Sequence, residues 1–144
     1  MDAGMTEPPT VNSLLIAERV FRDQYTQEWV IAGVFDSLMF DRLPAVHQRF
    51  DVFFQITNVS KAVDLHLRVE HADSGEVMAA VGGPLTTSDP LRVVEQQVVM
   101  RGASFTEEGK YWIQLLSREE ILAQAPLYVI LRTEDSDGPD GCEE

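Results

Sequence analysis

Apolar residues recur at every second position along much of this chain, which is the period of a β-strand whose two faces meet different surroundings. The pattern is clearest between Glu107 and Leu131. Residues 109–116 alternate in this way, and after a polar break at residues 117–120 the segment Leu127 to Leu131 alternates again. Two such runs predict an antiparallel hairpin, and we expect the rest of the chain to be organised around it.

Six further segments carry strand signatures. They are residues 13–21, 29–35, 50–57, 63–70, 76–81 and 91–100. A helix is conceivable for residues 13–21, but the short break and the β-prone run that follow favour a hairpin. Residues 36–48 are expected to form a strand end and a cross-over between sheets, because Pro44 has no N–H for a strand ladder. Gly82 to Pro84 are expected in a loop.

These eight strand candidates come with no heptad pattern, internal repeat or convincing long helix. The fold class that we predict is all-β, an immunoglobulin-like antiparallel β-sandwich of about eight strands. We expect a disordered N-terminal segment at residues 1–11, a β-sandwich domain at residues 12–132 and an acidic disordered tail at residues 133–144.

A local motif supports this architecture. The run Glu107-x-Gly109-x-Tyr111-x-Ile113 resembles the tyrosine-corner region of immunoglobulin-like domains, with Ile113 at the position where those domains usually have a cysteine. The resemblance implies a positive φ at Gly109 and a buried Tyr111 whose hydroxyl returns to the upstream backbone. Any antiparallel sandwich can begin a strand with Gly-x-Tyr, so that alternative stays open, and it leads to the same fold class.

The order of motifs along the whole chain also resembles an uncharacterised bacterial family of small β-sandwich proteins, a domain of unknown function. The matching segments are residues 13–20, 31–36, 43–47, 73–76 and the hairpin that begins at Gly109. The resemblance covers most of residues 12–131. It implies a fold and assigns no site residues.

Charge and composition exclude several classes of function. The 144 residues include 24 Asp and Glu against 11 Lys and Arg, a net charge of −13, which disfavours binding to the phosphates of nucleic acid. No apolar run is long enough to span a membrane, so no membrane partner is expected. The one cysteine, Cys142, cannot form an intramolecular disulfide, and the first ten residues lack a secretory pattern. We therefore expect a cytoplasmic protein.

Catalytic chemistry finds little support in the sequence. His47 and Asp51 are four residues apart and are the nearest approach to a general base, so an enzyme with a site there is the third-ranked function. His66 and His71 are expected to face opposite sides of one strand, where they cannot share a metal. No phosphate loop, paired-cysteine or His-Glu-x-x-His pattern occurs. We expect no catalytic residues, no metal and no cofactor.

The remaining candidate is a contact surface. Trp112 and Tyr128 have the opposite parity to Tyr111 and Val129, so they should stand on the outer face of the hairpin and pair across it. Together with Leu116 and Ile130 they would form an apolar patch, which favours association with a protein partner or a homodimer. The predicted function is thus a non-enzymatic binding or structural module. A small-molecule-binding or carbohydrate-binding sandwich is the alternative.

Overall fold

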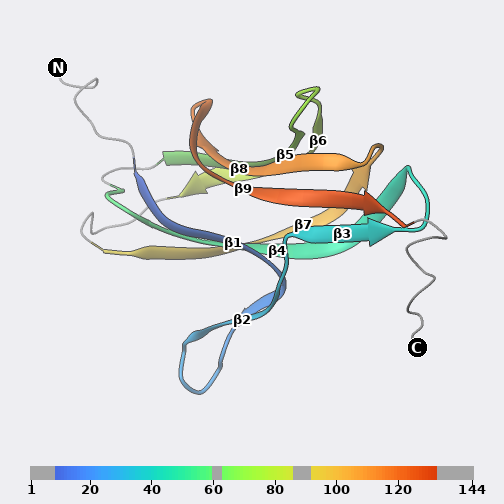
Figure 1. Ribbon diagram of the computed structural model, residues 1–144. Helices are drawn as coiled ribbons and strands as arrows, with labels where there is room; N and C mark the ends of the chain where they lie inside the picture. Colours follow the sequence, from blue (N-terminus) through green and yellow to red (C-terminus); the bar gives the residue numbers. More distant parts are fainter. Residues whose placement is uncertain (1–8, 60–62, 86–91, 133–144) are drawn as a thin grey trace.

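The structure, a computed structural model, describes residues 9–59, 63–85 and 92–132 (Figure 1). Nine strands follow one another within these residues. They are β1 (Thr10–Arg22), β2 (Trp29–Val34), β3 (Ser37–Phe40), β4 (Ala45–Thr57), β5 (Val63–His71), β6 (Val77–Leu85), β7 (Val94–Phe105), β8 (Gly109–Ser117) and β9 (Glu120–Leu131).

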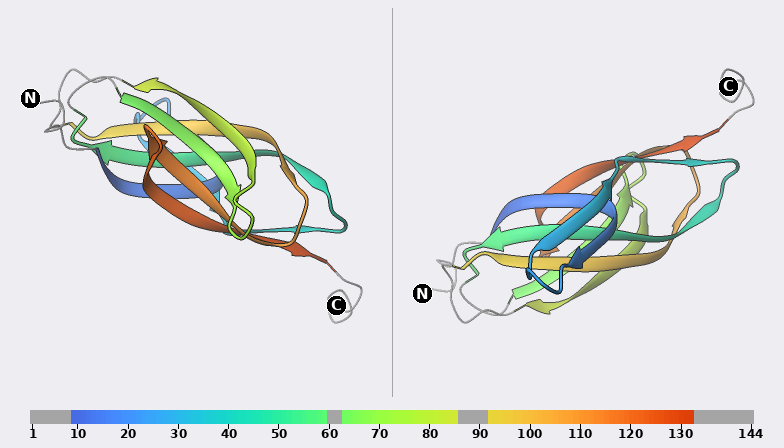
Figure 2. Two further views of the ribbon diagram at one scale, coloured as in Figure 1. Left: turned by 90° about the horizontal axis from the view of Figure 1, so that it is seen from above. Right: turned by 90° about the horizontal axis from the view of Figure 1, so that it is seen from below.

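The strands form two sheets packed face to face (Figures 1 and 2). Sheet A has the order β2-β1-β4-β7, and sheet B has the order β3-β9-β8-β5-β6. Every neighbouring pair is antiparallel except β3 and β9, which are parallel. The predicted immunoglobulin-like β-sandwich is confirmed, with nine strands where about eight were expected.

The additional strand is β3. Its four residues are too few to show a clear alternation, and they lie in the segment predicted as a cross-over. The chain does cross there: it leaves sheet A after β2, pairs with β9 in sheet B through β3, and returns to sheet A as β4. The prediction of a loop at Gly82 to Pro84 is wrong, since these residues belong to β6. Pro84 is tolerated because β6 is an edge strand.

The core lies between the two sheets and follows the predicted alternation. Phe50, Val52, Phe54 and Ile56 face it from β4. Leu65, Leu67 and Val69 face it from β5. β5 was predicted to have one buried and one solvent-exposed face, and it has both. Burial of these core side chains is the main source of stability.

The tyrosine corner is present. Tyr111 is fully buried, and its hydroxyl donates a hydrogen bond of 2.7 Å to the carbonyl oxygen of Glu107. Gly109 has a φ of 132°, the positive value that the motif requires. The Tyr111 ring packs edge-on against His71 and Phe105, with centroids 4.7 and 5.0 Å away. The corner therefore joins the entry of β8 to both sheets, since β7 ends at Phe105.

The far end of the β8–β9 hairpin is a two-residue turn. Ser117 pairs with Glu120, and the intervening Arg118 and Glu119 have φ values of 53° and 71°. Two positive φ values match the type I′ turn, whose twist suits a hairpin. A turn of this type usually contains Asn or Gly, so the sequence Arg118-Glu119 did not predict it. The predicted polar break at residues 117–120 is two residues longer than the turn, because Ser117 and Glu120 belong to the strands.

A buried carboxylate marks the place where β1 leaves sheet A. β1 pairs with β4 as far as Ala17 opposite Asp51, and its remaining residues pair with β2 in a hairpin that crosses β4 in the view from below (Figure 2). Asp51 has no exposed surface. Its side chain accepts hydrogen bonds from the Val20 N–H at 2.8 Å, from Arg49 at 3.0 and 3.2 Å and from Gln97 at 3.0 Å. The carboxylate thus ties β1 and β7 to β4.

The structure places the start of the sandwich earlier in the chain than the predicted N-terminal boundary. β1 begins at Thr10, so Thr10 and Val11 pair with Thr57 and Ile56 and belong to the sandwich rather than to the N-terminal segment. The predicted acidic tail at residues 133–144 lies outside the described residues.

Gly109→Val is expected to lower the free energy of unfolding by at least ~1 kcal/mol, because a β-branched side chain is strained at a positive φ. Tyr111→Phe, which removes only the buried hydroxyl, should lower it by about 1 kcal/mol. Chemical denaturation of the two variants and the parent measures both effects. Parent-like stability in Gly109→Val would contradict the conformational requirement at the corner.

The variant Asp51→Asn tests whether the buried carboxylate is ionised, through the dependence of the stability on pH. Burial alone would raise the pKa of Asp51, but hydrogen bonds from Arg49, Val20 and Gln97 outweigh it and lower that pKa. A depressed folded-state pKa gives stability that is present above the unfolded-state value of about 3.9 and is lost as the pH falls through the folded-state value.

Asp51→Asn should therefore be less stable than the parent at pH 7, by about 1 to 3 kcal/mol, and the difference should shrink below pH ~4. Denaturation curves from pH 7 to pH 2 measure it. Asp64→Asn, which alters an exposed carboxylate, is the control and should follow the parent. A difference that stays constant with pH would contradict an ionised Asp51 in the folded state.

Candidate interaction surface

The outer face of sheet B carries a row of exposed apolar side chains where β9 meets the edge strand β3. Residues directly opposite each other in a ladder share a face of the sheet. Tyr128 pairs with Ser37, and Ile130 pairs with Met39. Tyr128 and Ile130 are each 41% exposed, and Met39 is 51% exposed. Three large apolar side chains thus stand side by side in solvent.

Trp112 extends this row onto β8. It is half-buried, and the Lys110 ammonium lies 4.1 Å from the centre of its ring, a cation–π contact. The register pairs Tyr128 with Lys110 and Trp112 with Pro126. Trp112 and Tyr128 share the outer face as expected, but they are diagonal neighbours rather than the cross-strand pair that parity allowed. We call Met39, Trp112, Tyr128 and Ile130 the β3–β9 patch.

Leu116 does not belong to the patch, which corrects its sequence assignment. It is only 3% exposed and pairs with His66 on one side and Ile121 on the other. Leu116 stands on the outer face, as parity counted from Trp112 predicts, because it pairs there with the exposed His66, but its side chain is covered on that face. Met39 takes a place in the patch that sequence reasoning missed, because β3 itself was missed.

A polar network borders the patch at the centre of sheet B. Gln114 is 2% exposed and links three strands. Its oxygen accepts a hydrogen bond of 2.7 Å from Arg68, and its nitrogen donates to Glu70 and Gln124 at 3.0 Å. Because these groups satisfy one another, this part of the face is held together internally, and the β3–β9 patch lies beside it on β3, β9 and the start of β8.

The structure does not bring His47 and Asp51 together. His47 packs against the rings of Phe35 and Phe50, with centroids 6.3 and 6.0 Å away, whereas the Asp51 carboxylate binds Val20, Arg49 and Gln97. Burial lowers the pKa of His47, and the backbone of Arg49 and the charge of Glu18 oppose that effect. The general-base pair expected from their spacing is therefore absent from the geometry.

The other two histidines have separate environments. His71 is buried, and its Nδ1 accepts hydrogen bonds from the N–H groups of Asp73 and Ser74 at 3.3 and 3.2 Å, which stabilises the β5–β6 turn. His66 is exposed on the outer face. Among the described residues, no cluster of three or more His, Cys, Asp or Glu could hold a metal ion.

Nothing in the described part of the chain forms a helix that is both long and apolar enough to cross a membrane.

Solved structures with a similar fold share little sequence with this chain. It is similar to part of the alkylpurine DNA glycosylase AlkC from Pseudomonas fluorescens, solved bound to DNA containing an abasic site analog, at 13% identity and a TM-score of 0.50, over 91% of this chain and 32% of that one. An immunoglobulin-like protein from Pseudomonas aeruginosa matches at 14% identity and a TM-score of 0.42, over 88% of this chain and 99% of that one.

A β-D-glucoside glucohydrolase from Trichoderma reesei matches at 14% identity and a TM-score of 0.45, over 85% of this chain and 19% of that one. This chain thus spans about a third of the glycosylase and about a fifth of the glucohydrolase. At such identities the likeness concerns the fold and not the function.

No curated protein matches this sequence. The model of a family of unknown function, DUF6941, matches residues 12–130, which include almost all of the sandwich. The chain therefore belongs to this family.

Proposed function

We propose that this domain is a non-enzymatic protein-binding module of the cytoplasm, and that the β3–β9 patch is its contact surface. The observation that carries the proposal is the exposure of Met39, Tyr128 and Ile130 on adjacent strands. Contiguous exposed apolar side chains on a water-soluble surface usually mark association. Tyrosine and tryptophan are favoured anchors of protein interfaces, and the patch has one of each.

The position of the patch suits an interface. It ends at β3, an edge strand of four residues, so a partner can approach it without meeting another strand of sheet B. The Gln114 network beside it gives a rigid polar border. An apolar centre with a polar rim is the usual anatomy of a protein contact.

Charge favours a different protein over a second copy of this chain. The net charge is −13, so two copies repel each other over long range. Asp36 and Asp41 flank β3, and Asp41 forms an ion pair of 3.7 Å with Arg132. Glu108 lies beside β9, where its carboxylate accepts a hydrogen bond of 2.8 Å from the N–H of Leu131. A partner with basic residues around an apolar contact would complement this surface.

The double variant Tyr128→Ser/Ile130→Ser should lose its partner while the fold is kept, because both side chains are partly exposed and point away from the core. Affinity capture from the native host, with quantitative mass spectrometry, compares it with the parent. We expect the captured amount of at least one protein to be lower with the double variant than with the parent by about tenfold or more, the equivalent of 1.4 kcal/mol.

The matched control is Phe21→Ser/Val34→Ser, which removes two exposed apolar side chains from the β1–β2 hairpin instead, at 49% and 60% exposure. It should capture as the parent does. Equal loss in both double variants, or loss in neither, would contradict the proposal. Sedimentation of the parent tests the homodimer: we expect a monomer at high micromolar concentration, and a dimer that Trp112→Ala dissociates would favour self-association.

A further inference from the structure

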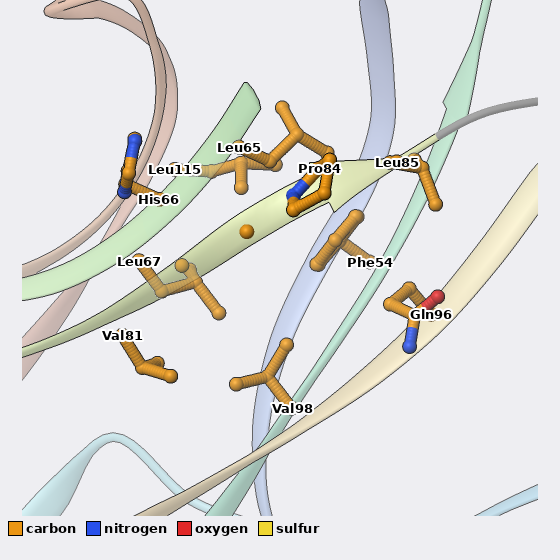
Figure 3. Close-up of a pocket in the computed structure, with 12 residues that line it drawn as sticks. Phe54, Leu65, His66, Leu67, Val81, Pro84, Leu85, Gln96, Val98 and Leu115 are labelled. Atoms are coloured by element: carbon orange, nitrogen blue, oxygen red, sulfur yellow. The ribbon is translucent and has the colours of Figure 1, made fainter. Parts of the chain in front are cut away.

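A pocket of about 230 Å³ opens between the two sheets along the side where the edge strands β6 and β7 face each other. Phe54, Leu67 and Leu115 lie at its base, and all three are buried in the core. Figure 3 shows the side chains of Leu65, Leu67, Phe54 and Val98 surrounding the space from both sheets. The pocket is separate from the β3–β9 patch, which lies on the opposite edge of sheet B.

The pocket exists because one inward-facing position has no side chain. On β6 the positions opposite Leu67, Leu65 and Val63 are Val81, Gly83 and Leu85. A Cβ built at Gly83 would meet no atom within 4 Å, so this position opens onto empty space. Valine and leucine occupy the inward positions on either side, and glycine interrupts an otherwise apolar row.

The backbone does not explain this glycine. The described glycines with positive φ are Gly33, Gly75, Gly102 and Gly109, so Gly83 has a conformation that other residues adopt. The neighbouring Gly82 has a different reason, because a Cβ there would clash with the His66 imidazole and with the carbonyl oxygen of Leu65. Glycine inside a strand weakens it and often marks a place where a ligand approaches. We infer that Gly83 keeps room for a ligand.

A second inward position is also unusual. On β7 the residues opposite Ile56, Phe54, Val52 and Phe50 are Val94, Gln96, Val98 and Met100, and Gln96 is the polar exception. Gln96 lines the pocket and is exposed to solvent. Its amide nitrogen donates a hydrogen bond of 3.3 Å to the carbonyl oxygen of Gln97. The second N–H of that nitrogen and the amide oxygen can form a hydrogen bond with one neutral polar group on a bound molecule.

Size and charge define the ligand class. Among the described residues that line the pocket there is no Asp, Glu, Lys or Arg, and His66 is the one titratable side chain, so an ionised ligand would lose its hydration without gaining a permanent counter-charge. An apolar cavity of about 150 Å³ accommodates benzene, which scales to roughly nine non-hydrogen atoms for this pocket. We propose that the pocket binds a small neutral aromatic molecule with one hydrogen-bonding group, of the size of indole.

Indole is the probe, and methyl signals in ¹H–¹³C NMR spectra report where it binds. We expect saturable shifts of the Leu65, Leu67, Val81 and Val98 methyl signals. The affinity for benzoate, a charged aromatic of the same size, should be lower than that for indole by at least about tenfold. Gly83→Val should weaken indole binding by at least about tenfold and leave the midpoint of thermal unfolding equal or higher, because it fills empty space in a strand.

Ala80→Val is the matched control, since Ala80 lies on the same strand but is exposed and faces outward with Arg68. It should bind indole as the parent does. If Gly83→Val does not fold, Val81→Phe, which enlarges an inward side chain at the mouth, replaces it and should also weaken binding. Unshifted methyl signals at the solubility limit of indole, or parent-like binding by the folded pocket variant, would overturn the proposal.

Discussion

The register of the β8–β9 hairpin is the constraint on which the candidate surface depends. It is fixed at one end by the tyrosine corner, where the Tyr111 hydroxyl binds the Glu107 carbonyl oxygen, and at the other by the turn at Arg118 and Glu119. A shift of one residue would exchange the two faces of each strand. Tyr111 and Val129 would then leave the core, and Tyr128 would enter it. One buried hydroxyl thus helps to decide which side chains a partner can meet.

The features that the sequence predicted are those set by local pattern. Val63 to Glu70 alternate strictly, so both faces of β5 could be assigned, and the Gly109-x-Tyr111 spacing located the corner. The features it missed depend on distant partners. β3 is defined by its pairing with β9, about 90 residues later in the chain, and that pairing brings Met39 beside Ile130. The burial of Leu116 likewise depends on its neighbours across two strand pairs, His66 and Ile121, which alternation along β8 does not show.

Asp51 shows the same limit for polar residues. Asp51 follows His47 by four residues in the sequence, and this spacing suggested that the two side chains could act together as a general base. In the fold its partners include Val20 and Gln97, which lie 31 and 46 positions away, and their hydrogen bonds give the carboxylate a structural role where β1 leaves β4. Gly83 is the converse case. Sequence placed it in a loop, and only its pairing with Leu65 reveals that its missing side chain leaves space in the core.

The two edges of the sandwich thus differ: the β3 edge presents apolar side chains to solvent, and a small pocket opens along the β6–β7 edge. The central claim is that the β3–β9 patch meets a partner, and site-specific photocrosslinking in the native host tests it most directly. A benzophenone amino acid replacing Tyr128 should give a discrete crosslinked product, and the same amino acid replacing Phe21 should not. Crosslinks only from position 21, or none from position 128, would contradict the account.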